Sequence, residues 1–72
     1  MVMMNIVKDL REEMGLSQKE LGNLVGVSRQ TINKIEVLNS NVSVKLAYRI
    51  SQVFGRTIEE VFIFKGEEPG AE

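Results

Sequence analysis

Four polar side chains near the middle of the chain have the types and spacing to form a row of hydrogen-bonding groups on one helix. Arg29, Gln30 and Thr31 are consecutive, and Lys34 follows about one helical turn later. On a helix, residues three and four positions apart lie on one surface. A helix pair that presents such a row is suited to placing hydrogen-bonding groups in the major groove of DNA. The chemistry that this set offers is recognition by hydrogen bonding.

Two short amphipathic helices joined by a tight turn, within residues 17–36, are predicted to position these side chains. Ser17 stands three residues before Glu20, which is the spacing of a capping box at the start of a helix. Gly26 can adopt the positive φ that ends this helix. Ser28 is a capping residue for the second helix. The second helix therefore begins with the polar side chains described above.

The same two helices carry apolar residues at helical spacing, which predicts that each packs against a core. Gly22 lies in the middle of the first helix, where glycine costs roughly 1 kcal/mol relative to alanine. A residue with this cost indicates the close approach of another helix. The apolar positions are Leu21, Leu24, Val25, Ile32 and Ile35.

Further helices are predicted on both sides of this pair. One precedes it and stops at Gly15, and one follows it between the cap Ser43 and the terminating Gly55. The segment between the pair and Ser43, residues 37–42, has no helical spacing and is predicted to be a loop. The apolar residues of the two helices are Ile6, Val7, Leu10, Met14, Leu46, Ala47, Ile50, Val53 and Phe54.

A second capping box, Thr57 with Glu60, predicts a short fifth helix that carries Ile58, Val61 and Phe62. We therefore expect an all-α fold, a compact five-helix bundle with room for a short C-terminal strand. The predicted domain covers residues 1–65. Residues 66–72 form an acidic tail without core residues, which we expect to be disordered.

The composition excludes several classes of function. Seventy-two residues are enough for one small domain with a limited core. The chain has no cysteine and no histidine, which rules out disulfides and thiolate metal sites and leaves little basis for zinc binding or histidine acid–base catalysis. A glycine-rich phosphate loop is also absent. We therefore expect a protein that is not an enzyme and that has no cofactor and no metal.

The charge of the chain is distributed unevenly. The net charge is −1, which by itself argues weakly against a partner as acidic as DNA. Residues 1–56 carry eight Lys or Arg and five Asp or Glu, whereas residues 57–72 carry one Lys and five Glu. The region that contains the predicted helix pair can therefore be locally positive.

Neither a membrane-spanning segment nor a signal peptide is predicted. No apolar run approaches the roughly 18 residues that cross a bilayer. The first residues lack a basic segment followed by a long apolar stretch. We expect a cytoplasmic protein.

The helix pair resembles the phage-repressor-like helix-turn-helix domains, also called the Cro/repressor or XRE family, whose fold is the lambda-repressor-like DNA-binding domain. The likeness covers about residues 5–62 and is strongest in the motif at residues 17–36. It rests on a glutamine that opens the first helix, a following Glu-Leu, a small residue for helix packing, a glycine at the turn and a polar opening to the second helix. These are Gln18, Glu20, Leu21, Gly22, Gly26, Ser28, Arg29, Gln30, Thr31 and Ile32.

The resemblance implies that the start of the second helix enters the major groove. Arg29 would suit guanine, Gln30 would suit adenine, and the Thr31 methyl group would suit a thymine methyl group. Lys34 would reach a base acceptor or a phosphate. The alternative is that these side chains form an ordinary solvated helix surface, and for Asn33 and Lys34 taken singly the two readings are nearly balanced.

The resemblance also implies contacts to the DNA backbone, which set the register rather than the sequence preference. Gln18 matches the family position that binds phosphate at the start of a helix, where free N–H groups also favour an anion. The remaining candidates are Ser28, Asn33, Asn39, Ser40, Asn41 and Ser43. The serines are first of all helix caps, and a phosphate contact would be additional.

Two further positions have implied structural roles. Arg11 and Glu36 match residues that often form an internal ion pair. After Glu36 the family usually has a glycine and then a proline, where this chain has Leu38 and Val42. We expect Asn39 to take the left-handed conformation instead, because asparagine tolerates it. Leu38 could then be exposed and available to a protein partner.

Residues 61–64, Val-Phe-Ile-Phe, are four successive apolar residues that cannot all face one core. We expect Ile63 or Phe64 to contribute to a homodimer contact, in which a short strand could take part. The alternative is that Phe64 folds back on the same monomer.

The resemblance implies a sequence-specific regulator of transcription that binds double-stranded DNA. A repressor that binds a palindromic operator as a dimer is the leading expectation. One alternative is an antitoxin or accessory subunit of an autoregulated operon that also binds a protein partner. Another is a protein-interaction module that has lost DNA reading. No membrane partner and no small-molecule substrate are expected.

Overall fold

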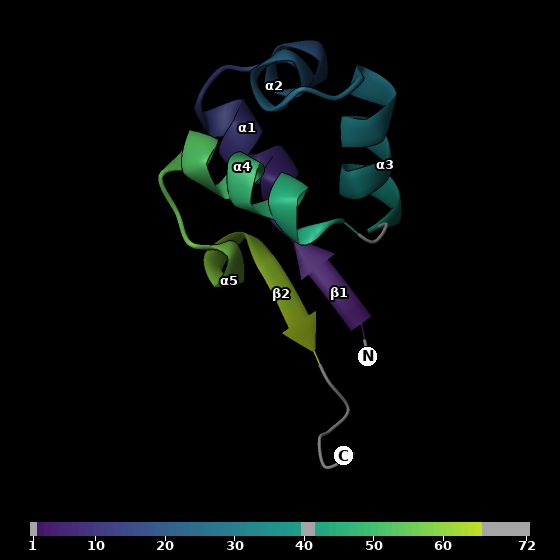
Figure 1. The fold of residues 1–72 in the computed structure, drawn as a ribbon, viewed down its shortest axis with the longest axis vertical. Helices are drawn as coiled ribbons and strands as arrows, with labels where there is room; N and C mark the ends of the chain where they lie inside the picture. Colours follow the sequence, from purple (N-terminus) through teal and green to yellow (C-terminus); the bar gives the residue numbers. More distant parts are fainter. Residues whose placement is uncertain (1, 40–41, 66–72) are drawn as a thin grey trace.

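The computed structural model describes residues 2–39 and 42–65, which form five helices and a two-stranded sheet (Figure 1). Helices α1 to α4 surround one core, and the sheet projects from the end of the bundle that carries α5. The expected all-α fold with a short C-terminal strand is confirmed. In chain order the elements are β1 (Val2–Asn5), α1 (Val7–Glu13), α2 (Gln18–Val25), α3 (Arg29–Leu38), α4 (Val44–Phe54), α5 (Ile58–Val61) and β2 (Phe62–Lys65).

Helices α2 to α5 begin at the capping residues that the sequence predicts. The Oγ atom of Ser17 accepts a hydrogen bond from the backbone N–H of Glu20 at 3.0 Å, and Glu20 Oε1 accepts one from the N–H of Ser17 at 2.8 Å. Thr57 and Glu60 form the same reciprocal pair at the start of α5. Each box satisfies two backbone donors that would otherwise have no partner within the helix.

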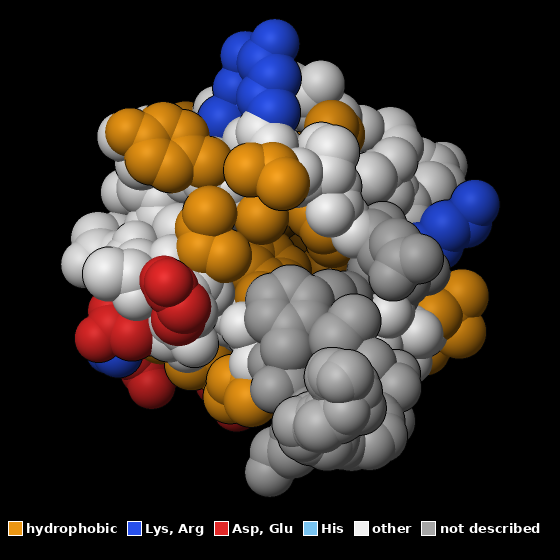
Figure 2. Space-filling view, turned by 60° about the horizontal axis from the view of Figure 1, so that its bottom comes forward, with side chains coloured by type: hydrophobic (Ala, Val, Ile, Leu, Met, Phe, Trp, Pro, Cys, Tyr) orange, Lys and Arg blue, Asp and Glu red, His pale blue; other side chains and the backbone are white. Residues whose placement is uncertain are grey.

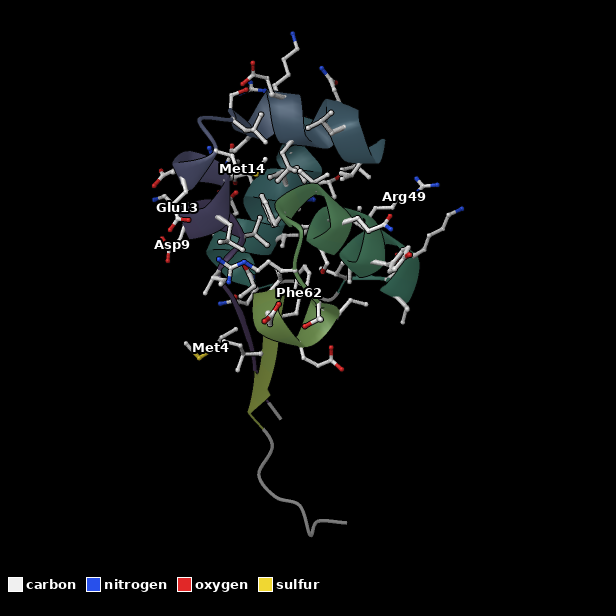
Figure 3. All side chains as sticks on the ribbon, turned by 90° about the vertical axis from the view of Figure 1, so that its left-hand side faces the viewer. Met4, Asp9, Glu13, Met14, Arg49 and Phe62 are labelled. Atoms are coloured by element: carbon white, nitrogen blue, oxygen red, sulfur yellow. The ribbon has the colours of Figure 1, made fainter. Side chains whose placement is uncertain are left out.

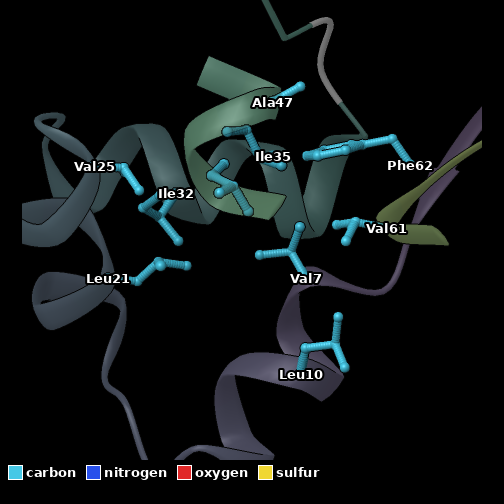
Figure 4. Packing of buried hydrophobic residues seen from close by; sticks show 10 residues of the cluster. Val7, Leu10, Leu21, Val25, Ile32, Ile35, Ala47, Val61 and Phe62 are labelled. Carbon is cyan, nitrogen blue, oxygen red and sulfur yellow. The ribbon is translucent and has the colours of Figure 1, made fainter. Parts of the chain in front are cut away.

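The core lies between the helices and extends to the first residue of β2 (Figure 4). Two residues expected in it are largely exposed: Leu24 is 60% exposed and Met14 is 52% exposed. Met14 follows the last residue of α1, and Leu24 lies on the flank of an α2 surface whose buried positions are residues 21, 22 and 25. The buried apolar residues are Val7, Leu10, Leu21, Val25, Ile32, Ile35, Ala47, Ile50, Val61 and Phe62.

Gly22 is needed because the backbone of the following turn passes very close to it. A Cβ atom built on Gly22 would lie 2.5 Å from the carbonyl oxygen of Val27. The prediction of a close approach is confirmed, although the neighbour is the α2–α3 turn rather than another helix. This contact lets α3 leave the end of α2 at a fixed position. Gly26 has φ 83°, the left-handed conformation expected at the end of α2.

Helix α3 is longer than the sequence indicated. Val37 and Leu38, which we expected in a loop, form its last turn and are 64% and 65% exposed. The helix ends at Asn39, with φ 49° and ψ 41°. Asn39 therefore takes the left-handed conformation that was expected in place of the missing glycine. Both residues face solvent, so they do not continue the helical spacing of the buried apolar residues. The sequence therefore did not indicate that the helix reaches them.

The sheet joins the two ends of the described chain. Strand β1 pairs with β2 in antiparallel fashion, with Val2 opposite Lys65 and Asn5 opposite Phe62. The backbone N–H of Ile6 extends the pairing by donating to the carbonyl oxygen of Val61 at 3.0 Å. Strand β1 was not predicted, because a strand of four residues is stable only against a partner, which here lies far along the chain.

Phe62 belongs to β2 rather than to the fifth helix, where we expected it. Its backbone is extended, with φ −115° and ψ 108°, and its side chain is 1% exposed. Strand β2 therefore begins inside the core and carries the chain out of it. Within the part of the chain that the structure describes, no helix is long and apolar enough to cross a membrane.

Candidate nucleic-acid interface

The N-terminal half of α3 presents polar side chains to solvent. Arg29 and Gln30 are exposed in its first turn, and Lys34 is exposed one turn later. The exposed position of Arg29 and Gln30 follows from the Ser28 cap, which begins the helix just before them and leaves Ile32 and Ile35 to face the core. Three of the four predicted base-reading residues are therefore free to meet a ligand.

Thr31, the fourth predicted base reader, is only half-exposed because it takes part in the cap. Its backbone N–H donates to Ser28 Oγ at 3.2 Å, and the two hydroxyl groups lie 3.2 Å apart. The hydroxyl groups of Ser28 and Thr31 thus satisfy each other. The contact that Thr31 can offer a ligand is mainly apolar.

A shallow groove brings the first residue of α2 next to the polar side of α3. Its volume is about 280 Å³. The lining unites base-reading and phosphate-binding candidates that lie up to 16 positions apart in the sequence. These residues are Gln18, Arg29, Gln30, Asn33 and Lys34. Each of them can donate at least one hydrogen bond.

The side chain of Gln18 is already engaged on one side. Its Nε2 atom donates to Glu36 Oε1 at 3.0 Å. An amide nitrogen carries two hydrogens, so one donor of Gln18 is used within the protein and one remains. The backbone N–H groups at the first residues of α2 add donors next to it.

Arg11 and Glu36 lie within ion-pair distance, as the resemblance implied. Arg11 Nε is 2.7 Å from Glu36 Oε2, and Arg11 Nη2 donates to Glu36 Oε1 at 3.1 Å. Arg11 Nη1 donates to the carbonyl oxygen of Leu16 at 2.8 Å, which ties down the α1–α2 connection. The Arg11 and Glu36 side chains are 10% and 1% exposed. The bidentate geometry is of the strong kind.

The hydrogen bond to Glu36 raises the pKa of Arg11, although burial acts in the opposite direction. A pKa that is higher in the folded state than in the unfolded state adds stability at lower pH, and this stability is lost as the pH rises through the folded value. Because arginine titrates only in strongly alkaline solution, the ion pair contributes fully at neutral pH.

The loop after α3 contains the remaining phosphate candidates. Ser43 is exposed, and its Oγ atom accepts the backbone N–H of Leu46 at 3.1 Å as the cap of α4. Asn39 is exposed, and its Oδ1 atom accepts a hydrogen bond from Asn5 at 3.0 Å. Asn33 is exposed beside the groove. Ser40 and Asn41 lie outside the residues that the structure describes.

Asn5 has a connecting role that was not predicted from the sequence. Its Nδ2 atom donates to the carbonyl oxygen of Ile35 at 2.9 Å as well as to Asn39, and its Oδ1 atom accepts the N–H of Val7 at 3.1 Å. Asn5 therefore connects β1, α1 and the end of α3. The signal that could have found it is an asparagine just before a helix, because asparagine side chains often bond the backbone two residues on in an Asx turn.

Ile63 lies on β2, where it is 37% exposed, and it pairs with Met4 of β1, which is 48% exposed. Phe64 lies on the same strand, opposite Met3, and its side chain is outside the described part. The short strand thus pairs within its own chain along one edge. Figure 2 shows apolar side chains gathered around a hollow on this end of the molecule.

Two acidic side chains and one basic side chain lie on opposite sides of the molecule. Asp9 and Glu13 of α1 project from one side, and Arg49 of α4 projects from the opposite side (Figure 3). The polar groove on α3 has Arg29 and Lys34 but no carboxylate in its lining. The groove therefore has a positive surface even though the net charge of the chain is slightly negative.

Comparison with known proteins identifies relatives of the whole fold. The family model described as Helix-turn-helix matches residues 7–61. A protein of Archaeoglobus fulgidus named "Uncharacterized HTH-type transcriptional regulator" is 45% identical over 62 residues, which are 86% of this chain and 87% of the relative. A protein of Methanothermobacter thermautotrophicus with the same name, "Uncharacterized HTH-type transcriptional regulator", is 43% identical over 70 residues, 96% of this chain and 99% of the relative.

A relative of similar length also occurs in a bacterium. The protein of Bacillus subtilis named "Uncharacterized HTH-type transcriptional regulator YgzD" is 43% identical over 65 residues, 90% of this chain and 98% of the relative. These matches confirm the resemblance inferred from the motif.

Proposed function

Because the chain belongs to the helix-turn-helix family, we propose that it is a regulator of transcription that binds double-stranded DNA and reads its sequence with the first turns of α3. The observation that carries this proposal is the groove in which Gln18 of α2 meets Arg29, Gln30 and Lys34 of α3. Donors for bases and donors for phosphates lie side by side there, and the lining has no carboxylate to repel DNA. A cytoplasmic location is part of the proposal.

The proposed division of labour follows the exposure of the side chains. Arg29 and Gln30 are fully available for paired hydrogen bonds, to guanine and to adenine respectively. Thr31 presents its methyl group, since its hydroxyl group is used by the cap. Lys34 lies one turn further along and binds a base acceptor or a phosphate.

Contacts to the backbone are proposed on both sides of these readers. Gln18 and Asn33 bind a phosphate on the α2 side of α3. Beyond the end of α3, the proposed phosphate contacts come from Asn39, Ser40, Asn41 and Ser43, and Ser28 contributes from the turn before α3. These side chains are neutral, so the release of counterions from DNA comes from the cations beside them, Arg29 and Lys34. The affinity for DNA should therefore fall as the salt concentration rises.

The first test is selection of bound sequences from a random duplex library. A sequence-specific regulator returns a consensus, and binding without sequence preference would contradict the proposal. Arg29→Ala and Gln30→Ala should each weaken binding to the selected site by roughly 1–3 kcal/mol and relax the preference at one base position. Lys8→Ala is the matched control, because Lys8 is exposed on α1, away from the groove.

We also propose that the protein binds as a homodimer and represses transcription. A domain of this size contacts one half-site, and a symmetric dimer reads a palindrome whose half-sites lie roughly 34 Å apart. The partly exposed Ile63, with Phe64 on the same strand, supports a contact between copies at the sheet end. A separate groove of about 510 Å³, between α4 and α5, includes Tyr48 and Ile58.

Light scattering at tens of micromolar protein tests the dimer, with Ile63→Asp as the disrupting variant. A dimer that becomes monomeric in this variant supports the contact. A monomer at all concentrations would refute it, and a palindromic consensus from the selection would then need another explanation. A reporter gene placed behind the selected site distinguishes repression from activation.

An antitoxin or accessory subunit is the second candidate. It is favoured by the exposed apolar end of α3, where Val37 and Leu38 are each more than 60% exposed. Isolation of an equimolar protein together with this chain from its native host would favour it. If the Leu38→Ser variant no longer co-purifies with that protein, the contact with the partner lies at the end of α3.

A further inference from the structure

We propose that Glu36 is a positioning residue for DNA binding, which acts by fixing the side-chain amide of Gln18. The inference rests on the proposed function, in which Gln18 binds a DNA phosphate. Glu36 itself has no access to DNA, because its side chain is 1% exposed. Its effect on binding must therefore pass through a neighbour.

The hydrogen bonds around Glu36 have a fixed direction. A carboxylate can only accept, so the Gln18 amide must turn its nitrogen and not its oxygen toward Glu36. The Nε2 atom lies 3.0 Å from Glu36 Oε1. The second N–H of Gln18 is left for the groove, on the side where Arg29 and Asn33 also lie.

Arg11 holds the carboxylate in place for this purpose. It donates to both oxygens of Glu36, and it shares Oε1 with Gln18. The carboxylate thus accepts three N–H groups, two of them from Arg11, and has little freedom to rotate. The positive charge of Arg11 also offsets a negative charge that would otherwise lie beside the proposed phosphate.

The consequence for binding is preorganisation. A glutamine side chain on an exposed helix start samples many rotamers, and it loses this freedom when it binds. In this chain the freedom is already restricted in the unbound protein, so a phosphate meets a donor that is in position. Glu36 belongs to α3, so the same contact also sets where the phosphate donor lies relative to Arg29 and Gln30.

A purely structural role for Glu36 makes a different prediction. If Glu36 only holds α1 to α3, its replacement lowers stability, and the affinity of the molecules that remain folded is unchanged or falls independently of Gln18. If Glu36 acts through Gln18, its replacement has no further effect once Gln18 is gone. The two roles are separated by a double-mutant cycle on affinity.

The experiment measures binding to the selected duplex by the wild type, Q18A, E36Q and the double variant, with the folded fraction of each determined by circular dichroism at the same temperature. We expect Q18A to lose roughly tenfold in affinity. E36Q should lose part of that, and the double variant should bind as Q18A does. If the double variant loses affinity by the product of the two single losses, the two residues act independently and the inference is overturned.

E36Q leaves Arg11 without its partner and could unfold the chain. The second variant is therefore R11M/E36M, since replacing both members of a buried ion pair by apolar side chains is often neutral or stabilising. This variant removes the partner of Gln18 while keeping the core filled. With Gln18 present it should lose as much DNA affinity as E36Q does, and in the Q18A protein it should cause no further loss. Equal losses in both backgrounds would again refute the role.

Proton exchange in the unbound wild type gives a test without any variant. The Gln18 side-chain amide should show one proton that exchanges more slowly than those of the exposed Gln30, and exchange equal to Gln30 would contradict the contact. If the wild type shows no sequence preference at all, the proposed function fails as well. If it binds a consensus but the losses multiply, only the role of Glu36 fails.

Discussion

Two helices of this chain begin with the same capping arrangement and yet differ in length. Ser17 with Glu20 and Thr57 with Glu60 form reciprocal hydrogen bonds of 2.8–3.0 Å and 2.9–3.2 Å. Helix α2 then continues for eight residues, whereas α5 stops after four. Because the caps are equivalent, the difference in length must arise from the residues beyond each cap.

Those residues meet different surroundings in the two helices. In α2 the backbone of the turn covers Gly22, and the helix runs on until Gly26 ends it. In α5 the chain reaches Phe62, which is buried and whose extended backbone pairs with β1. A cap thus determines where each helix begins, whereas α2 ends at a local glycine and α5 ends where the chain enters the sheet.

The largest expected effect comes from removing the side chain that ends α5. Phe62→Ala should lower the free energy of unfolding by about 3–5 kcal/mol, because it leaves a cavity in the core. For a domain of this size such a loss leaves much of the protein unfolded, and urea denaturation followed by circular dichroism measures it. Met4→Ala, on an exposed position of the same sheet, is the control and should lose much less. Equal losses would mean that sheet pairing, not burial, ends the helix.

The next effect concerns the contact that lets α2 continue. Gly22→Ala should destabilise the protein by about 1–3 kcal/mol, although alanine favours helices, because the new methyl group would overlap the Val27 carbonyl. Asn23→Ala, in the same helix but exposed, should be neutral or slightly stabilising. The midpoints in urea of these two variants compare them directly. A stabilised Gly22→Ala protein would show that the turn can move aside.

These two positions also show how far the structure could be predicted from the sequence. The cost of glycine in a helix predicted a close neighbour at Gly22, but not which segment supplies it. Four successive apolar residues at 61–64 predicted that not all of them face one core, but not that Phe62 lies outside the fifth helix. The partner strand β1 carries no local signal, since it pairs with residues about 60 positions away. Local chemistry was therefore readable from the sequence, and distant pairing was not.

The candidate site divides in the same way. Arg29 and Gln30 were identified from their types and their place after a cap, and both are exposed. The resemblance supplied Gln18 and the pairing of Arg11 with Glu36. The hydrogen bond from Gln18 to Glu36 was not foreseen, because it spans 18 residues and depends on how α2 meets α3.

A smaller effect tests whether the two caps are equivalent. Ser17→Ala and Thr57→Ala should each reduce the free energy of unfolding by about 1 kcal/mol, because each removes the acceptor for one backbone N–H. Ser17→Asp, which retains an acceptor, is the control. If the two variants lose clearly different amounts of unfolding free energy, the short helix α5 depends on its cap differently from the longer α2.

The smallest effect is expected at an apolar residue that we predicted in the core. Leu24→Gln should change the free energy of unfolding by less than about 0.5 kcal/mol, because the side chain is 60% exposed. Leu21→Ala in the same helix, where the side chain is fully buried, should lose about 2–5 kcal/mol. A large loss from Leu24→Gln in thermal denaturation would indicate a contact that forms only between copies.

The pairing of β1 with β2 has a consequence for the order in which the chain is made. Synthesis produces Val2–Asn5 before its partner Phe62–Lys65, which is among the last described residues to emerge. During most of that interval the first strand lacks its partner, and the place of Phe62 in the core is empty. Helix α3 is complete by residue 38, but the sheet forms only after β2 has been made and pairs with β1.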